Sequence, residues 1–261
     1  MGVAEATRAV AREQVLVAML GIPRLLAHPV WRAPDPEEGR GLGVLLVPGF
    51  GFGDRSLHLT RTWLRKRGYV PTGARIGLNV GCTSDLVDRL ERGLEAHAEA
   101  TGGPVVLFGQ SRGGGLARLV SVRRPELVRG LVMLASPVLD QLGAHPSVMR
   151  VARTLARLSR VGIPGLLNED CFAGACYDTH STGLKQPLRV PAIAVYSRND
   201  LIAPWELCAD PCAECVEVDS THTGMGLDPE VYRLLAPRLA AWARDRDRTA
   251  APEPEPVHAP G

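Results

Sequence analysis

The sequence has few aromatic residues, little net charge and no long apolar run. Phe, Trp and Tyr make up 5% of the 261 residues, and 30 basic side chains face 28 acidic ones, for a formal net charge of +2. Nucleic-acid-binding proteins need a basic stripe that neutralises phosphates, and single-strand binders also stack bases on aromatic rings. No uncharged apolar stretch reaches the roughly 18 residues that a transmembrane helix requires. We therefore expect no nucleic-acid partner and no transmembrane segment.

The N-terminal segment is apolar only in part. Residues 15–20 are apolar, but Glu5 and Glu13 precede them and Pro23-Arg24 follows soon after. A secretory signal needs a basic start and an uninterrupted apolar core, so we expect a cytoplasmic protein, with peripheral membrane contact left open. Over residues 1–40 we expect a helical extension, either a capping helix or an amphipathic segment on a surface.

The six cysteines are spread too widely for the disulfide framework of a small secreted domain. They include the pair Cys171 and Cys176 and the trio Cys208, Cys212 and Cys215. Neither group has the paired C-x2-C spacing of a structural zinc site. We expect free buried thiols, with a local disulfide in either group as the alternative, and no metal site.

Apolar runs alternate with helical patterns through the middle of the chain, which indicates βαβ units. The strand-like runs span residues 42–47, 69–76, 104–108, 128–134, 191–196 and 215–218. The main helical patterns cover residues 57–67, 86–98, 116–122 and 229–244. Thr83-Ser84-Asp85 offers an N-cap to the second of these helices. We expect an α/β fold with a mainly parallel sheet and helices on both faces.

The alternation stops over residues 138–190, where no strand-like run occurs. A basic amphipathic helix near residues 147–160 falls in this stretch, which we expect to form an inserted lid. Its apolar residues suit an acyl pocket or an ordinary core. The domain is expected to span residues 41–245, and residues 246–261, which contain a short Pro-Glu repeat, are expected to form a disordered tail.

The most informative stretch is Gly109-Gln110-Ser111-Arg112-Gly113, which follows an apolar run and precedes a helical pattern. G-x-S-x-G in this context is typical of a nucleophile elbow, a sharp turn that exposes the serine oxygen and leaves room only for small neighbours. Ser111 is therefore a candidate nucleophile. The alternative is a glycine-rich connection with an incidental serine.

A serine nucleophile needs a base that a carboxylate orients, and in an elbow of this kind the acid and then the histidine follow the serine. Asp200 lies in the loop after residues 191–196, and His222 lies in a polar loop after the last strand-like run. Because the carboxyl ends of parallel strands share one edge of the sheet, we expect Ser111, Asp200 and His222 to meet there.

Other side chains compete less well for these two roles. Asp210 and Asp219 are alternative acids, but neither directly follows a central strand-like run. His145 and His180 belong to the insertion, where we expect substrate contact or solvent exposure instead.

A tetrahedral intermediate also needs donors for its oxyanion. The backbone N–H of Arg112 is one candidate, and that of Phe50, in the glycine-rich loop 48–54, is the other. This loop is not a dinucleotide fingerprint, because Asp54 stands where the third glycine belongs, and it lacks the Gly-Lys-Ser/Thr ending of a phosphate-binding loop.

Residues 45–51, 109–113, 196–200 and 220–225 together resemble the α/β-hydrolase superfamily, especially its bacterial lipase and esterase branch. The resemblance implies Ser111 as nucleophile, His222 as base, Asp200 as acid, the Phe50 and Arg112 amides as oxyanion hole, and no cofactor. Two residues depart from the pattern. Pro48 stands where many relatives have His, and Arg112 is larger and more polar than usual, with its side chain either reaching solvent or binding a substrate carboxylate.

The expected activity is hydrolysis of a small-molecule or lipid carboxylic ester through an acyl-enzyme on Ser111. Two alternatives stay open: a thioesterase or acyltransferase with the same triad, and a non-catalytic binding module with the same fold. The acyl chain length, the alcohol part and the oligomeric state are left open.

Overall fold

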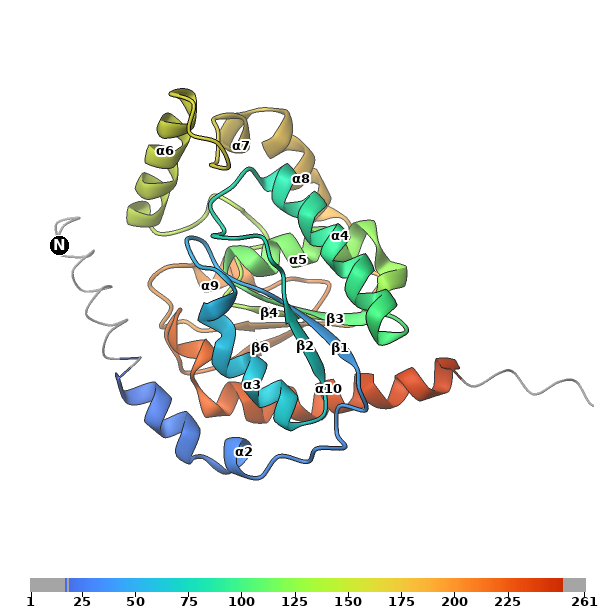
Figure 1. The fold of residues 1–261 in the computed structure, drawn as a ribbon. Coiled ribbons are helices and arrows are strands. Elements are labelled where there is room, and N and C mark those ends of the chain that lie inside the picture. The colour runs from blue at the N-terminus through green and yellow to red at the C-terminus, as the bar shows by residue number, and fades with distance from the viewer. Residues whose placement is uncertain (1–16, 18, 251–261) are drawn as a thin grey trace, which may run out of the picture.

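The computed structural model describes residue 17 and residues 19–250, and its centre is a six-stranded sheet (Figure 1). The strands run in the order β2-β1-β3-β4-β5-β6, and all neighbouring strands are parallel. Their bounds are β1 (Gly43–Val47), β2 (Val70–Gly73), β3 (Val105–Gln110), β4 (Val128–Leu134), β5 (Ala192–Tyr196) and β6 (Glu214–Glu217). The expected strands and the α/β fold class are thus confirmed, with strand ends moved by a few residues at most.

Helices cover both faces of this sheet (Figure 1). One face packs against α3 (His58–Lys66) and α10 (Pro229–Ala250), and the other against α4 (Thr83–Thr101) and α5 (Arg112–Arg123). Shorter elements complete the fold: α2 (Pro29–Arg32), α9 (Trp205–Cys208) and the 3-10 turns η1 (Asp54–Leu57), η2 (Pro125–Leu127) and η3 (Gly224–Gly226).

The register of the strands divides their side chains between two cores. Leu46, Phe108 and Val132 are neighbours across β1, β3 and β4, and all three face α3 and α10. The preceding residue of each strand (Leu45 and Leu107 among them) faces α4 and α5 instead. Alternation of this kind follows from the two-residue period of a strand, and it explains why the strands read as continuous apolar runs.

The N-terminal extension belongs to the first of these cores. Residues 19–27 are helical, and Leu25, Val30 and Trp31 are buried against α3. The indole N–H of Trp63 donates to the Val30 carbonyl at 3.0 Å. Within the described residues the extension is therefore a packed cap, while residues 1–16 and 18 lie outside the description.

The insertion between β4 and β5 contains α6 (Pro146–Arg160), α7 (Asp170–Ala173) and α8 (Ala175–Lys185), which Figure 1 shows at the top of the molecule. α8 packs against α4 and α5, and its Leu184 belongs to the core beneath them. α6 and α7 instead pack in a small third apolar cluster, which includes Ala152 and Phe172 and reaches Cys176 at the start of α8. Only α6 and α7 therefore have the position expected of a lid.

Two expected boundaries differ in the structure. Cys82, rather than Thr83, Ser84 or Asp85, occupies the N-cap of α4, and it forms no side-chain capping hydrogen bond. The Ser84 hydroxyl is directed to α8 instead, so a tertiary contact replaces the local one. α10 continues through Ala250, five residues into the expected tail, because neither glycine nor proline occurs between Pro237, which the helix accommodates, and Pro252.

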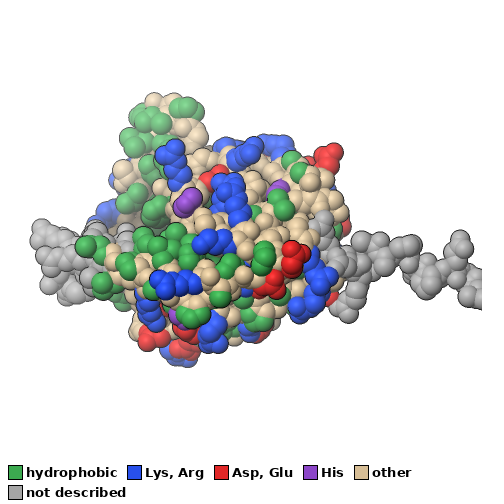
Figure 2. Space-filling view, turned by 60° about the horizontal axis from the view of Figure 1, so that its bottom comes forward, with side chains coloured by type: hydrophobic (Ala, Val, Ile, Leu, Met, Phe, Trp, Pro, Cys, Tyr) green, Lys and Arg blue, Asp and Glu red, His purple; other side chains and the backbone are tan. Residues whose placement is uncertain are grey.

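No helix in the described part of the chain is long and apolar enough to span a bilayer. On the face shown in Figure 2, Lys and Arg side chains are scattered among acidic and apolar ones and do not gather in a single stripe. This distribution accords with the balanced composition of the sequence.

Candidate active site

Ser111 lies at a sharp turn between β3 and α5. Its backbone has φ 52° and ψ −128°, in a region that non-glycine residues rarely adopt and that costs about 1–3 kcal/mol. A Cβ at Gly109 would lie 2.4 Å from the Gly114 Cα, and one at Gly113 would lie 2.3 Å from the Val47 carbonyl oxygen. Neither separation is sterically possible. The turn therefore requires these two glycines, and strain of this kind is concentrated at functional sites.

The structure brings Ser111, His222 and Asp200 together at the carboxyl edge of the sheet. His222 Nε2 lies 2.9 Å from Ser111 Oγ, and His222 Nδ1 lies 2.7 Å from Asp200 Oδ2. A carboxylate can only accept, so Nδ1 carries the proton and Nε2 is left to accept the serine hydroxyl. The three side chains form one hydrogen-bonded chain, as the sequence led us to expect.

The carboxylate of Asp200 is fixed by its own loop. Its side chain is 1% exposed, and its Oδ1 accepts the backbone N–H groups of Ile202 at 2.8 Å and Ala203 at 2.9 Å. These bonds leave Oδ2 for His222. The loop after β5 thus holds the Asp200 carboxylate in place, and the carboxylate in turn orients the His222 imidazole.

The alternative acids are engaged elsewhere. Asp210 is fully buried and forms an ion pair with Arg118, 2.5 Å from its Nε. Asp219 accepts a hydrogen bond from the Asn199 side chain at 2.7 Å. Asp219 thus ties together the loops that follow β5 and β6, whereas Asp210 joins α5 to the segment before β6.

The histidines of the insertion are structural as well. His145 Nδ1 accepts the backbone N–H of Ser147 and so caps α6. His180 is 1% exposed, and its Nε2 lies 3.0 Å from Ser84 Oγ. Burial lowers the pKa of His180 below its usual value. The expectation that these histidines contact substrate or solvent is wrong for His180, because α8 packs on the core.

The Arg112 side chain takes neither of the two courses that the sequence left open. Its guanidinium donates to the carbonyls of Asn79 at 3.1 Å and Gly81 at 2.8 Å, and to Thr83 Oγ1 at 3.2 Å. It also lies over the Phe50 ring. Desolvation lowers the pKa of Arg112 to about 10, so the group stays cationic at neutral pH. Arg112 therefore ties the segment before α4 to the nucleophile turn.

The loop that carries Phe50 passes directly beside Ser111. A Cβ at Gly49 would lie 3.3 Å from Ser111 Cβ. Asn79 is fully buried; its side-chain Nδ2 donates to the Pro48 carbonyl at 2.7 Å, and its backbone carbonyl accepts the Gly51 N–H at 3.2 Å. Sequence reasoning missed Asn79, because a single asparagine outside any motif carries no local signal. The assignment of the Phe50 and Arg112 amides to an oxyanion hole stays a prediction.

Two cavities meet at Ser111. The first lies beneath α6 and α7, and its apolar wall includes Leu116, Leu119, Met149, Ala152, Leu167 and Phe172. The second lies on the other side of the serine and is lined by Gly49, Phe52, Leu57, Leu59, His222 and Leu227. His222 therefore borders the second cavity, whereas the insertion forms much of the first.

No protein-family model and no curated protein sequence matches this chain. Solved structures do resemble it. The lipase BlEst2 of Bacillus licheniformis, in mature form, has a TM-score of 0.59 and 14% identity over 79% of this chain and 94% of its own. The monoacylglycerol lipase of Paleococcus ferrophilus has a TM-score of 0.56 and 17% identity over 78% and 95%. The α/β-hydrolase enzyme MGS-MChE2, from a lagoon-sediment metagenome, has a TM-score of 0.54 and 21% identity over 80% and 93%.

These likenesses define the class of fold. The parallel sheet flanked by helices is the α/β-hydrolase fold, and this chain adopts it. At such low identity the resemblance speaks for the fold alone, and the chemistry has to be argued from the site.

Proposed function

We propose that this protein is a serine hydrolase of carboxylic esters, with Ser111 as its nucleophile. The observation that carries the proposal is the hydrogen-bonded chain from Asp200 through His222 to a serine on a strained turn. Two of the structural neighbours named above are lipases, which accords with this chemistry. No metal or organic cofactor enters the proposed reaction.

Each member of the chain has one task in the proposed reaction. Ser111 Oγ attacks the ester carbonyl while His222 Nε2 takes the hydroxyl proton, and Asp200 stabilises the imidazolium through Nδ1–H. The carbonyl oxygen becomes an oxyanion that the backbone N–H groups of Phe50 and Arg112 bind. His222 returns the proton to the leaving alcohol, and water then releases the acid from Ser111 by the same steps.

The two cavities assign the two halves of the ester. The leaving alcohol must accept a proton from His222, and His222 borders the second cavity. The alcohol therefore leaves on that side, and the acyl chain occupies the apolar cavity beneath α6 and α7. The substrate class that fits is an ester of an apolar carboxylic acid.

Hydrolysis of p-nitrophenyl esters of graded acyl length tests the proposal. We expect turnover by the wild type and a loss of roughly 10⁶-fold in kcat for Ser111→Ala, because removal of the nucleophile alone removes most of the catalysis in triad enzymes. Ser159→Ala, on α6 and outside both cavities, is the matched control and should retain activity. Undiminished turnover by a folded Ser111→Ala protein would overturn the assignment.

A further inference from the structure

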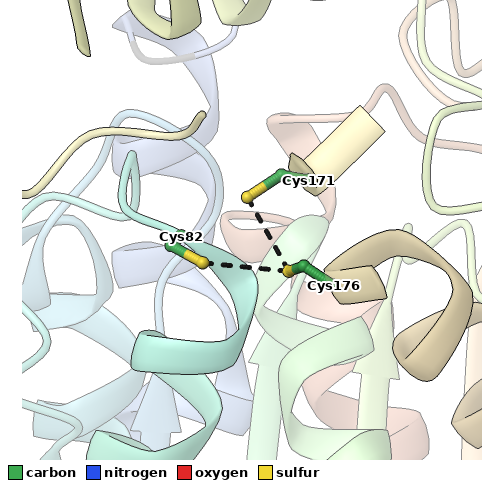
Figure 3. Close-up of side chains that lie close together, drawn as sticks. All are labelled: Cys82, Cys171 and Cys176. Atoms are coloured by element: carbon green, nitrogen blue, oxygen red, sulfur yellow. Dashed lines mark hydrogen bonds between the residues drawn. The ribbon is translucent and has the colours of Figure 1, made fainter. Parts of the chain in front are cut away.

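Three cysteines from distant parts of the chain converge beside the nucleophile turn. Cys82 immediately precedes α4, whereas Cys171 lies on α7 and Cys176 on α8 (Figure 3). Cys176 Sγ lies 3.8 Å from Cys82 Sγ and 3.8 Å from Cys171 Sγ, and all three sulfur atoms lie within 4.8 Å of one another. Figure 3 shows the three side chains directed toward one another. No local pattern in the sequence indicates this group, because Cys82 is remote from the other two cysteines.

The spacing of these sulfurs matches a metal–thiolate centre. Zinc binds thiolates at about 2.3 Å with tetrahedral angles, which places its sulfur ligands about 3.8 Å apart. Two of the three separations already have this value, so a small movement of one side chain completes the set. Three protein ligands leave the fourth position of zinc to water or another small donor.

The charges around the cluster favour a divalent ion. Arg112 lies close enough to all three thiols to interact with each of them electrostatically. In the described part of the chain its guanidinium donates to carbonyls and a hydroxyl and pairs with no carboxylate. Three thiolates and one Zn²⁺ carry a single net negative charge, which the guanidinium neutralises. A buried cation without an anionic partner is costly, and the metal centre would supply that partner.

Hydrogen-bond donors beside Cys176 are positioned to stabilise a thiolate there. The Ser84 hydroxyl donates to Cys176 Sγ at 3.3 Å, and His180 Nε2 stands behind it at 3.0 Å. Donors around a sulfur ligand of this kind orient it and stabilise its ionised form.

We infer that Cys82, Cys171 and Cys176 form a binding site for a zinc ion, which ties the insertion to the start of α4. The inference is separate from the ester chemistry, because none of the three sulfurs contacts Ser111 or His222 in the described contacts. Its structural consequence concerns the first cavity, since Cys171 forms part of that wall. Zinc would hold α7 and α8 in the arrangement that closes the cavity.

Metal titration of the full-length, reduced, metal-free protein tests the inference. We expect one Zn²⁺ per chain with micromolar or tighter affinity, measured by competition with a chromophoric chelator. Co²⁺ should give near-ultraviolet sulfur-to-cobalt charge-transfer bands that Zn²⁺ abolishes. Cys82→Ser should weaken zinc binding at least tenfold.

The exposed cysteines supply the control. Cys212 and Cys215 lie away from the cluster on the surface, so the Cys212→Ser/Cys215→Ser double variant should fold normally and keep the affinity and the cobalt bands. Retention by this variant excludes the two exposed cysteines as ligands even if Cys82→Ser fails to fold. The inference is overturned if the reduced wild type binds no zinc, if the double variant loses the metal, or if a folded Cys82→Ser protein binds it as tightly as the wild type.

Discussion

Apolar side chains are more completely buried in the sheet than in the insertion. Strands β1, β3 and β4 bury side chains on both faces, with exposures of 0–1% for Leu46, Leu107 and Val132. On α6, by contrast, Val151 is 53% exposed and Leu158 is 40% exposed. The proposed catalytic groups lie on loops at the edge of the sheet, and about half of the residues that line the first cavity belong to the insertion. In the proposed function, the reaction and the choice of substrate therefore depend on separate parts of the molecule.

The largest effect is expected at the carboxyl edge of the sheet. Asp200→Asn should lower kcat by about 10⁴-fold, because an amide at this place favours the wrong imidazole tautomer and cannot stabilise the imidazolium. The fold should survive, since Asn can still accept the Ile202 and Ala203 N–H groups through its side-chain oxygen. Steady-state kinetics with circular dichroism checks both points. A loss smaller than tenfold would contradict the role given to Asp200.

The next largest effect concerns the stability that a buried ion pair gives to the core beside the sheet. Asp210→Asn removes the partner of the fully buried Arg118 and should reduce the free energy of unfolding by about 3–5 kcal/mol, because an uncompensated buried charge remains. Asp88→Asn is the matched control at an exposed pair with Arg123, where the loss should not exceed about 1 kcal/mol. Urea unfolding of both variants gives the comparison. Equal losses would show that the buried pair has no special weight.

The insertion should respond in specificity more than in stability. Ala152 is buried and lines the first cavity, so Ala152→Phe should shorten the acyl optimum and lower kcat/KM for long esters by about tenfold while short esters are still cleaved. Val151→Phe places the same ring on the exposed side of the same helix and should leave the profile unchanged. Measurement of kcat/KM for both variants over the graded ester series tests this difference. Identical profiles for the two variants would separate the first cavity from acyl binding.

The smallest effect concerns pH and the far end of α4. His97 is buried with Nε2 2.9 Å from the Val70 carbonyl, and burial lowers the pKa of His97. Its unfolded form therefore binds a proton at higher pH than its folded form, so stability is complete above about pH 6.5 and falls as the pH drops below that value. His97→Gln keeps a donor without a titrating group and should show a shallower decline. Urea midpoints between pH 7 and pH 5 measure the difference, and parallel curves would exclude His97 as a source.

The sequence was informative wherever local pattern and function coincide. The apolar runs predicted the strands, and the G-x-S-x-G turn predicted where Ser111 would stand. Strand order along the chain then placed Asp200 and His222 at the same edge. These inferences need only the two-residue period, the geometry of one turn and the shared edge of parallel strands.

Contacts between distant segments could not be predicted in this way. Nothing near Arg112 in sequence shows that its guanidinium binds the Asn79 and Gly81 carbonyls, or that Cys82 joins Cys171. The N-cap of α4 was misplaced for the same reason, since Ser84 turns to a residue of α8. Such contacts depend on how the helices and strands pack together, and this packing cannot be read from a single sequence.

Covalent labelling by a fluorophosphonate tests the central claim most directly. The reagent needs a serine oxygen that a base has activated, so the native protein should form one adduct, which peptide mass spectrometry should place on Ser111. Heat-denatured protein should form none, because the hydrogen bonds to His222 and Asp200 are then lost. A native protein that stays unlabelled, or that carries its adduct on another serine, would contradict the proposal that Ser111 is the nucleophile of a hydrolase.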